Sequence, residues 1–299
     1  MRIVYSPRYA IDLGAHVFPT AKYGLVLERL VDAGVVTPGD IVEPEPASWD
    51  DLALVHTAEY LEKLRRGTFT IEELALLEVP WSAGLVDGYR LMTGGTIEAA
   101  RFALAVRAPA VCHLGGGLHH GFPDHGEGFC VFNDVAVAIR VVLRDGLASS
   151  VAVVDLDVHQ GNGTAAIFAD DPRVFTCSIH QQYNYPVHKP QSSVDIGLPD
   201  GTRDAEYHDR MAGALKQVFD HMPELVFYLA GADPYEDDQL GGLALTKDGL
   251  RQRDRRVLQA ARNHGVPVVV CLAGGYARKL ADTVEIHAAT VEEASRIVS

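Results

Sequence analysis

Apolar, β-branched runs recur along the chain, separated by longer stretches with helical periodicity. The clearest runs predict buried strands at Arg2–Tyr5, Ala110–His113, Val151–Asp157, Val174–Ile179, Leu225–Ala230 and Val266–Leu272. The amphipathic stretches predict helices at Leu85–Val106, Val135–Arg144, Ala205–Phe219 and Leu250–Asn263. Strands that alternate with helices of this length form a parallel sheet covered on both faces. The pattern therefore predicts a three-layer α/β/α fold around a central parallel sheet.

The whole chain, residues 1–299, is predicted to form a single domain. No internal repeat or low-complexity linker divides the sequence. The loop-like segment Val42–Ser48 contains two prolines but is too short to separate two domains. One α/β domain of this size is ordinary.

Composition narrows the function classes. The formal charge is −14, from 26 basic and 40 acidic residues, which argues against a general nucleic-acid binder. It is compatible with a cationic substrate or a lysine-rich peptide, and equally with acidity that only serves solubility. The N-terminal segment lacks the pattern of a signal peptide, and no apolar run approaches the roughly 18 residues of a membrane span. We therefore expect a soluble cytoplasmic protein without membrane contacts.

The four cysteines are widely spaced and form no Cys-x-x-Cys pair. Cys112, Cys177 and Cys271 lie in or beside apolar runs, where a reduced cysteine packs as a small hydrophobe. Neither a disulfide framework nor cysteine-bound zinc is expected. Cys130 differs, because it lies close to a histidine pair.

Polar residues follow five of the predicted strands, where loops of a parallel sheet converge. They are His119 and His120, Asp157 and His159, His180, Asp233, and Tyr276. Because the carboxyl ends of parallel strands meet at one edge, these residues are expected to gather into one site. Five such strand ends make a site more credible than any single motif.

The segment after Val151–Val154 carries the clearest metal signal. Side chains alternate along a strand, so Asp155, Asp157 and His159 are predicted to point the same way. Two carboxylates and an imidazole side by side call for a cation. Asp233, in a Gly-Ala-Asp-Pro turn, is the predicted third ligand beside Asp157 and His159. Three protein ligands leave a position open, as in catalytic zinc sites, and the O/N set also suits Fe²⁺. Taken singly, either aspartate could equally cap a neighbouring loop.

The remaining strand-end residues supply acid–base chemistry. His119 and His120 follow a Gly-Gly-Gly-Leu turn, and adjacent imidazoles can act as acid, base or electrostatic stabiliser. Asp155 is expected to accept a hydrogen bond from one of them and favour its charged form. Tyr276 after Gly274-Gly275 can donate to an oxyanion, although a tyrosine there can also simply begin a helix. Ser178 and the main chain after it can hold a second, harder cation with Asp155.

These residues lie in five motifs that occur in one order along almost the whole chain. The motifs are Gly115-Gly116-Gly117-Leu118-His119-His120, Gly128-Phe129-Cys130-Val131-Phe132-Asn133-Asp134, Asp155-Leu156-Asp157-Val158-His159-Gln160-Gly161-Asn162-Gly163, Gly231-Ala232-Asp233-Pro234 with Asp238-Gln239-Leu240-Gly241, and Gly274-Gly275-Tyr276. In them the chain resembles the zinc-dependent histone deacetylase family, on the arginase–deacetylase fold. The segment His16-Val17-Phe18-Pro19, with Lys22-Tyr23, is most similar to the class IV branch and to bacterial histone-deacetylase-like amidohydrolases.

The resemblance implies a role for each matching residue. Asp157, His159 and Asp233 would be the zinc ligands. Catalytic residues would be His119, His120 and Tyr276, with Asp155 orienting His119 and Asn162 orienting His120. A structural monovalent cation, usually potassium, would be held by Asp155, Asp157, Ser178 and the main chains of His159 and Ile179. Gly128, Phe129 and Tyr185 would line a narrow channel for an acyl-lysine stem, with Leu240 near its mouth and Cys130 close to the acyl pocket.

The implied reaction is zinc-assisted hydrolysis of an acetyl or longer acyl amide on a lysine side chain of a peptide or protein. His120 is the expected base as water attacks, and Tyr276 and zinc would stabilise the oxyanion. Asn162 departs from class I members, which carry an aspartate there, so it should raise the pKa of His120 less. Glu78 falls near an acidic residue with which relatives grip the substrate backbone.

Three alternative functions are also considered for this chain. The nearest is deacetylation of acetylpolyamines or other small amides, although those relatives carry a long insertion for which this chain has little room. Arginase-like binuclear manganese chemistry would need an Asp-x-His-x-Asp pattern, and Gly161 stands at its last position. A non-catalytic acyl-lysine binder could have lost Tyr276 or a histidine, but all are present.

Overall fold

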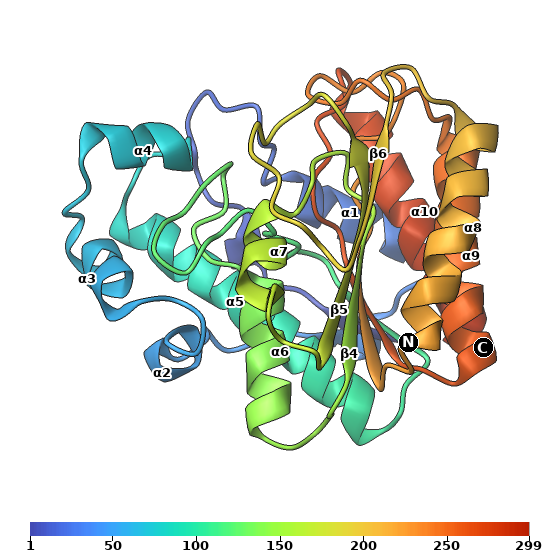
Figure 1. Ribbon diagram of the computed structural model, residues 1–299, viewed down its shortest axis with the longest axis horizontal. Helices are drawn as coiled ribbons and strands as arrows, with labels where there is room; N and C mark the ends of the chain where they lie inside the picture. Colours follow the sequence, from blue (N-terminus) through green and yellow to red (C-terminus); the bar gives the residue numbers. More distant parts are fainter. Residues whose placement is uncertain (299) are drawn as a thin grey trace.

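The strands of the computed structural model, which describes residues 1–298, form one eight-stranded sheet in the order β2-β1-β3-β8-β7-β4-β5-β6 (Figure 1). Every neighbouring pair is parallel. The strands are β1 (Arg2–Val4), β2 (Ile41–Val42), β3 (Ala110–His113), β4 (Val151–Asp155), β5 (Val174–Gln181), β6 (Val194–Leu198), β7 (Leu225–Leu229) and β8 (Val268–Cys271). The predicted central parallel sheet is therefore confirmed.

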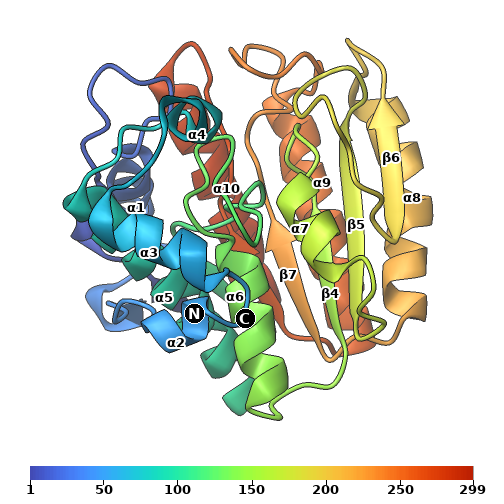
Figure 2. The same ribbon diagram turned by 60° about the vertical axis from the view of Figure 1, so that its left-hand side comes forward.

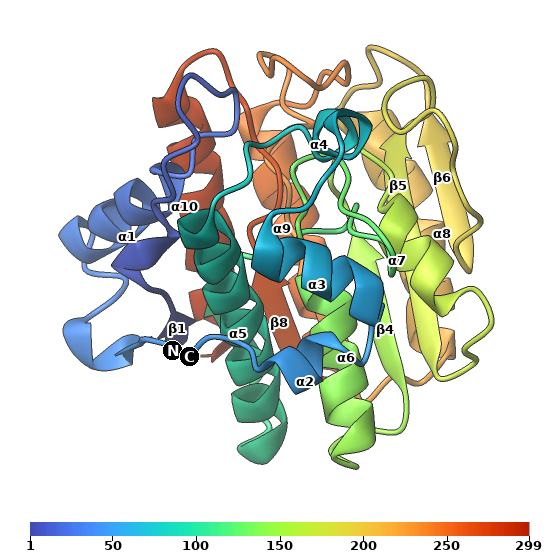
Figure 3. The ribbon, with the colours of Figure 1, turned by 90° about the vertical axis from the view of Figure 1, so that its left-hand side faces the viewer.

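Helices cover both faces of this sheet and give it three layers (Figures 1 and 3). One layer holds α1 (Lys22–Asp32), α8 (Asp204–Asp220), α9 (Lys247–His264) and α10 (Leu280–Val298). The other holds α5 (Ala83–Ala105), α6 (Asp134–Arg144) and α7 (Asn162–Phe168). Outside that second layer lie α2 (Trp49–Leu52), α3 (Ala58–Arg66) and α4 (Ile71–Leu77), of which α2 packs on α6 and α3 on α5. Two short 3₁₀ turns are η1 (Pro7–Tyr9) and η2 (Pro38–Asp40).

The central strands form because they are apolar enough to be buried on both faces. All residues of β3, β4, β7 and β8 are buried, as expected for strands covered by helices on each side. Helix α9 shows the local signals that set a helix's ends: Thr246 accepts a hydrogen bond from the Gly249 N–H at its start. Gly265 ends it in the left-handed conformation at φ 66°.

The strand ends and their loops gather at one end of the molecule, next to α4 (Figure 2). This edge positions the candidate site, because loops following β3, β4, β7 and β8 meet there. Among residues 1–298, no helix combines the length and apolar character needed to cross a bilayer.

Several predicted boundaries were wrong, and two of them affect the site. The strand predicted at Val151–Asp157 ends at Asp155, whereas the strand predicted at Val174–Ile179 continues to Gln181. The latter takes in His180, which we had placed after the strand. The loop predicted at Val42–Ser48 begins inside β2, a two-residue edge strand.

Candidate active site

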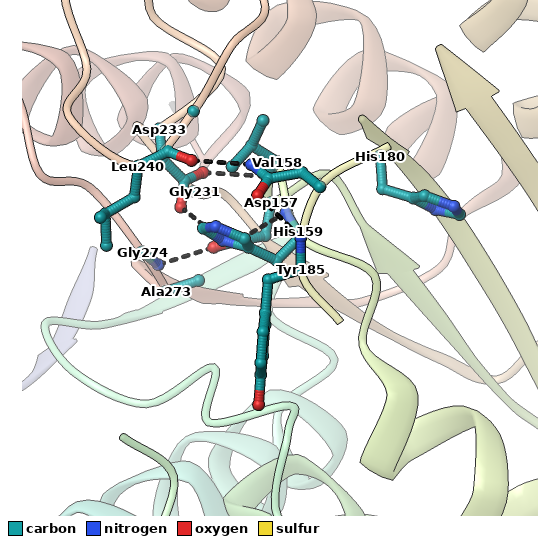
Figure 4. A network of polar contacts seen from close by, with 12 residues as sticks. Asp157, Val158, His159, His180, Tyr185, Gly231, Asp233, Leu240, Ala273 and Gly274 are labelled. Atoms are coloured by element: carbon teal, nitrogen blue, oxygen red, sulfur yellow. Dashed lines mark hydrogen bonds and ion pairs between the residues drawn. The ribbon is translucent and has the colours of Figure 1, made fainter. Parts of the chain in front are cut away.

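Three predicted ligands, Asp157, His159 and Asp233, form a buried cluster at the carboxyl edge of the sheet (Figure 4). One ligand atom from each lies within 4.8 Å of the others. His159 Nδ1 is 3.1 Å from Asp157 Oδ1 and 3.5 Å from Asp233 Oδ2. Asp157 and His159 follow β4, and Asp233 follows β7. The geometry brings two oxygen donors and one nitrogen donor to a single point.

The electrostatics of this cluster fit a bound cation. Burial and the adjacent Asp157 carboxylate raise the pKa of Asp233 to about 7. Burial alone would lower the pKa of His159, but the nearby carboxylates of Asp157 and Asp233 outweigh burial and raise that pKa to about 10. The two carboxylates thus favour positive charge in this buried cluster, and a divalent cation bound to neutral His159 would supply it. Asp233 Oδ2 accepts no hydrogen bond, so its lone pairs are free for a metal ion.

The reason that Asp157 and His159 converge differs from our prediction. Strand alternation cannot explain it, because β4 ends at Asp155. Instead, the Asp157 N–H donates to Asp155 Oδ1 at 3.2 Å, and the His159 N–H donates to Asp157 Oδ1 at 3.0 Å. Aspartates commonly bind the backbone N–H two residues on and so turn the chain. Two successive turns of this kind place the ligands, and Asp155 lies to one side of them.

The ligand loops are held by backbone donors and by one buried cation. The Val158 N–H donates to Asp233 Oδ1 at 2.9 Å, and the Gly274 N–H donates to Asp157 Oδ2 at 2.8 Å. Arg253, fully buried on α9, donates from Nη1 to the Leu156 and Gly231 carbonyls at 3.2 and 2.6 Å. These carbonyls belong to the loops after β4 and β7, so one guanidinium ties both ligand loops together.

The two histidines of the Gly-Gly-Gly-Leu-His-His motif lie beside the cluster. His119 Nδ1 is 2.7 Å from Asp155 Oδ2, and the two Nε2 atoms of His119 and His120 are 3.1 Å apart. His120 Nδ1 is 2.6 Å from Asn162 Oδ1. Asp155 and Asn162 thus lie where they can orient His119 and His120 respectively.

The surroundings of His119 and His120 shift the pKa values of the two rings in opposite directions. Burial alone would lower the pKa of His119, but the carboxylates of Asp155 and Asp157 raise it to about 9. Burial, together with the charges of His119 and His159, holds the pKa of His120 well below its usual value. A charged His119 therefore stands next to a neutral His120, the state in which His120 can accept a proton.

A pocket of about 160 Å³ leads from the surface to these residues. Its lining consists of Glu78, His120, Gly128, Phe129, His159, Asn184, Tyr185, Leu240 and Tyr276. The predicted channel residues Gly128, Phe129, Tyr185 and Leu240 are all included. Tyr276 is buried, with its ring centroid 6.4 Å from that of His159 and 6.0 Å from that of Phe129.

Behind this pocket lies a smaller cavity of about 30 Å³. Cys130, His119 and Tyr276 are among its lining residues, together with backbone of the Gly-rich turns at Gly116 and Gly274. Cys130, which we predicted to lie close to the acyl pocket, lines this cavity. The volume is on the order of one or two water-sized groups.

Not every polar strand-end residue joins the site. His180 lies within β5 and points away from Asp157 and His159 (Figure 4). Its Nδ1 is 3.0 Å from Ser178 Oγ, and burial lowers its pKa to about 4. We had expected it to converge with the other strand ends, and that prediction was wrong. Ser178 pairs with Asp155 in the register of β4 and β5, which makes the two predicted monovalent-cation ligands neighbours.

Three residues that shape the site carry little signal in the sequence. Arg253 resembles any arginine of an amphipathic helix. Asn184 donates to the Leu240 carbonyl at 2.7 Å and so fixes one wall of the pocket to another. Glu127 accepts a hydrogen bond from Asn162 at 2.8 Å. Its position between two glycines, just before the Gly128-Phe129 motif, was the only signal in the sequence.

A parallel α/β/α fold with a buried Asp-His-Asp cluster at its carboxyl edge is the architecture of the arginase–deacetylase class. The crystal structure described as the HDA15 HD domain has the same fold, with a TM-score of 0.81 at 22% identity over 98% of this chain and 90% of the other. Among curated proteins, an uncharacterized protein of Picosynechococcus is 41% identical over 287 residues, 95% of each chain. Histone deacetylase 2 of Arabidopsis thaliana is 33% identical over 301 residues, 95% of this chain and 77% of that protein.

The family profile of the histone deacetylase domain matches residues 16–291. The chain therefore belongs to the histone deacetylase family and is a hydrolase that acts on acetyl amides. The resemblance seen in the five motifs is confirmed.

Proposed function

We propose that this protein is a zinc-dependent deacetylase of lysine side chains in peptides or proteins. The observation that carries the proposal is the pocket, which has aromatic walls and reaches His159 of the Asp157, His159 and Asp233 cluster. An acyl-lysine presents a long apolar stem with a single amide at its end. Such a shape requires a narrow apolar passage with all of the polar chemistry at the bottom.

Asp157, His159 and Asp233 are the proposed metal ligands. Their two oxygens and one nitrogen suit Zn²⁺ and also Fe²⁺, and three protein ligands leave room for substrate. A divalent ion held there supplies a Lewis acid for the acyl carbonyl and lowers the pKa of nearby water. Gly231 and Gly274 leave the carboxylates space, because a Cβ at either position would collide with Asp157 or Asp233.

His120 is the proposed general base. It is neutral, its Nδ1 is occupied by Asn162, and it lines the pocket at the end where the amide would lie. His119, held by Asp155, is the charged partner that can return a proton to the departing amine. Tyr276 lines the same pocket and would donate its hydroxyl to the oxyanion as the carbonyl is attacked.

Phe129 and Tyr185 are the proposed walls for the lysine stem, with Gly128 beside them and Leu240 at the mouth. The inner cavity of about 30 Å³ suits a group as small as the methyl of an acetyl group, and we propose that it disfavours a long alkyl chain. The formal charge of −14 is compatible with a lysine-rich peptide substrate. We propose acetyl-lysine as the preferred substrate on these grounds.

A monovalent cation, K⁺ by family resemblance, is proposed beside this site. Asp155 and Ser178 are its side-chain ligands, on neighbouring positions of β4 and β5. We also propose that residues 1–299 form one catalytic domain, since strands from both halves of the chain belong to one continuous sheet, in which β3 pairs with β8.

The test is a substrate panel assayed with purified protein of measured metal content. The panel contains an acetyl-lysine peptide, the same peptide with a long-chain acyl group, and an acetylpolyamine. We expect the highest kcat/KM for the acetyl-lysine peptide. A tenfold preference for the acetylpolyamine would reject the lysine substrate, and a tenfold preference for the long acyl group would reject the size limit of the inner cavity. Failure of metal-loaded protein to hydrolyse any of the three would reject the proposed function.

A further inference from the structure

Glu127 is a partly buried carboxylate at the centre of a hydrogen-bond network beside the pocket. Its Oε1 accepts from Asn162 Nδ2 at 2.8 Å and from the Tyr185 hydroxyl at 2.7 Å. Its Oε2 lies 3.5 Å from His125 Nε2. Burial alone would raise the pKa of Glu127, but the hydrogen bonds from His125, Tyr185 and Asn162 outweigh burial and lower it. The group is therefore an ionised carboxylate, which can only accept hydrogen bonds.

Because the Glu127 carboxylate can only accept hydrogen bonds, it fixes the orientation of the Asn162 amide. An asparagine can turn its amide over and exchange the NH₂ and the carbonyl oxygen. Because Glu127 requires a donor, the NH₂ of Asn162 faces Glu127 and Oδ1 faces His120. His120 Nδ1, 2.6 Å from that oxygen, must then be the protonated nitrogen of a neutral ring. The lone pair consequently lies on His120 Nε2.

The His120 tautomer matters because only one nitrogen of that ring points toward the reaction. His120 Nε2 lies 3.1 Å from His119 Nε2, on the side of the metal cluster, whereas Nδ1 points away toward α7. If the Asn162 amide turned over, its NH₂ would donate to Nδ1 and the ring proton would move to Nε2. A base with its proton already on Nε2 cannot take one from water.

The geometry points to Glu127 as a positioning residue that sets the His120 base through Asn162. This inference rests on the proposed function, in which His120 removes a proton from water. Glu127 also positions Tyr185. The carboxylate accepts a hydrogen bond from the Tyr185 hydroxyl, and the Tyr185 ring lies edge-on to the His120 ring with the centroids 5.0 Å apart. One side chain thereby aligns a channel wall and the base.

The network also explains why asparagine suits position 162. An aspartate there would bring a second carboxylate to about 2.8 Å from Glu127 Oε1, with no proton between them. A glutamine at 127 together with an aspartate at 162 would restore one donor and one acceptor at the same distance. The Tyr185 hydroxyl could still form a hydrogen bond with the glutamine, since a hydroxyl both donates and accepts. Two of the four combinations thus fix the direction of the hydrogen bond, two carboxylates repel each other, and two amides leave the direction open.

The test is a double-mutant cycle of Glu127→Gln, Asn162→Asp and the combined variant. It measures kcat and KM on an acetyl-lysine peptide, metal content and unfolding temperature. We expect Glu127→Gln to lower kcat about tenfold with little change in KM, because its amide can present either end to Asn162. Asn162→Asp should lower kcat by about 10–100-fold. The combined variant should recover kcat to within a few-fold of wild type. Metal content should stay the same throughout.

Glu98→Gln is the matched control, because it makes the same chemical change at an exposed position of α5. It should leave kcat and KM unchanged. Wild-type kcat in Glu127→Gln, or a combined variant no better than Asn162→Asp alone, would overturn the inference while leaving the proposed function intact. A wild-type protein that hydrolyses no acyl-lysine peptide would instead reject the proposed function. A purely structural Glu127 would lower the unfolding temperature of Glu127→Gln without recovery of kcat in the combined variant.

Discussion

Gly274→Ala should destroy the metal site without changing any proposed ligand. A Cβ built on Gly274 falls well inside the contact distance of Asp233 Oδ2 and lies 2.5 Å from Asp157 Oδ2. Ordinary van der Waals contact begins at about 3.4 Å, so Asp157 Oδ2 alone would have to retreat by about 0.9 Å. Gly274 does not have a positive φ, so the steric clash is the only expected perturbation.

The displacement sets the size of the effect. Metal–ligand distances in good sites vary by only about 0.2 Å, so a shift of about 0.9 Å in one carboxylate removes that ligand. Disturbing a residue that merely supports a ligand weakens metal binding by about 10–100-fold. Because two ligands are displaced here, we expect zinc affinity to fall at least about 100-fold, or about 2.7 kcal/mol.

The assay is competition for zinc against a chelating dye, with circular dichroism to verify the fold. Gly213→Ala on α8 is the control, since nothing lies within 4 Å of its built Cβ. That variant should bind zinc normally and gain about 0.4–1 kcal/mol of stability, as expected when alanine replaces an unstrained glycine. Wild-type zinc affinity in Gly274→Ala would refute the assignment of Asp157 and Asp233 as ligands.

Three further changes probe the rest of the site. Tyr276→Phe should lower kcat by about 10²-fold with unchanged metal content, and wild-type turnover would exclude its oxyanion role. Asp157→Ala should abolish metal binding; stoichiometric zinc by elemental analysis would contradict its place among the ligands. Arg253→Met should reduce the free energy of unfolding by about 3–5 kcal/mol, because it leaves Asp254 and the Leu156 and Gly231 carbonyls without their buried partner. Urea unfolding measures this, and a loss below about 1 kcal/mol would show that the two ligand loops do not depend on Arg253.

The parts of the fold that could be predicted are those with a long and consistent pattern of apolar residues. The central strands are continuous apolar runs, because helices bury both of their faces. Edge strand β6 has only five residues, of which Leu198 alone is buried and the others alternate between partly buried and exposed, and β2 has just two residues. Helix α10 buries His287, Thr290 and Glu293, which blurs its apolar face. Short or partly polar elements of this kind give little periodic signal.

Some residues of the candidate site could likewise be predicted from the sequence, and others could not. Residue types at strand ends predicted Asp157, His159 and Asp233, because a parallel sheet gathers its carboxyl ends. The reason given for two of them was wrong, since turns built on Asp155 and Asp157 place them after the strand has ended. Glu127 could not be predicted, because its partners lie 35 and 58 residues along the chain and only the folded structure joins them.

Metal-dependent deacetylation is tested most directly by acetate release during stepwise reconstitution. Metal-free protein is titrated with zinc, and the hydrolysis of an acetyl-lysine peptide is followed together with the bound metal. We expect the rate to rise in proportion to occupancy and to reach its plateau at about one ion per cluster of Asp157, His159 and Asp233. Full activity in the metal-free protein, or no acetate release at full occupancy, would contradict it.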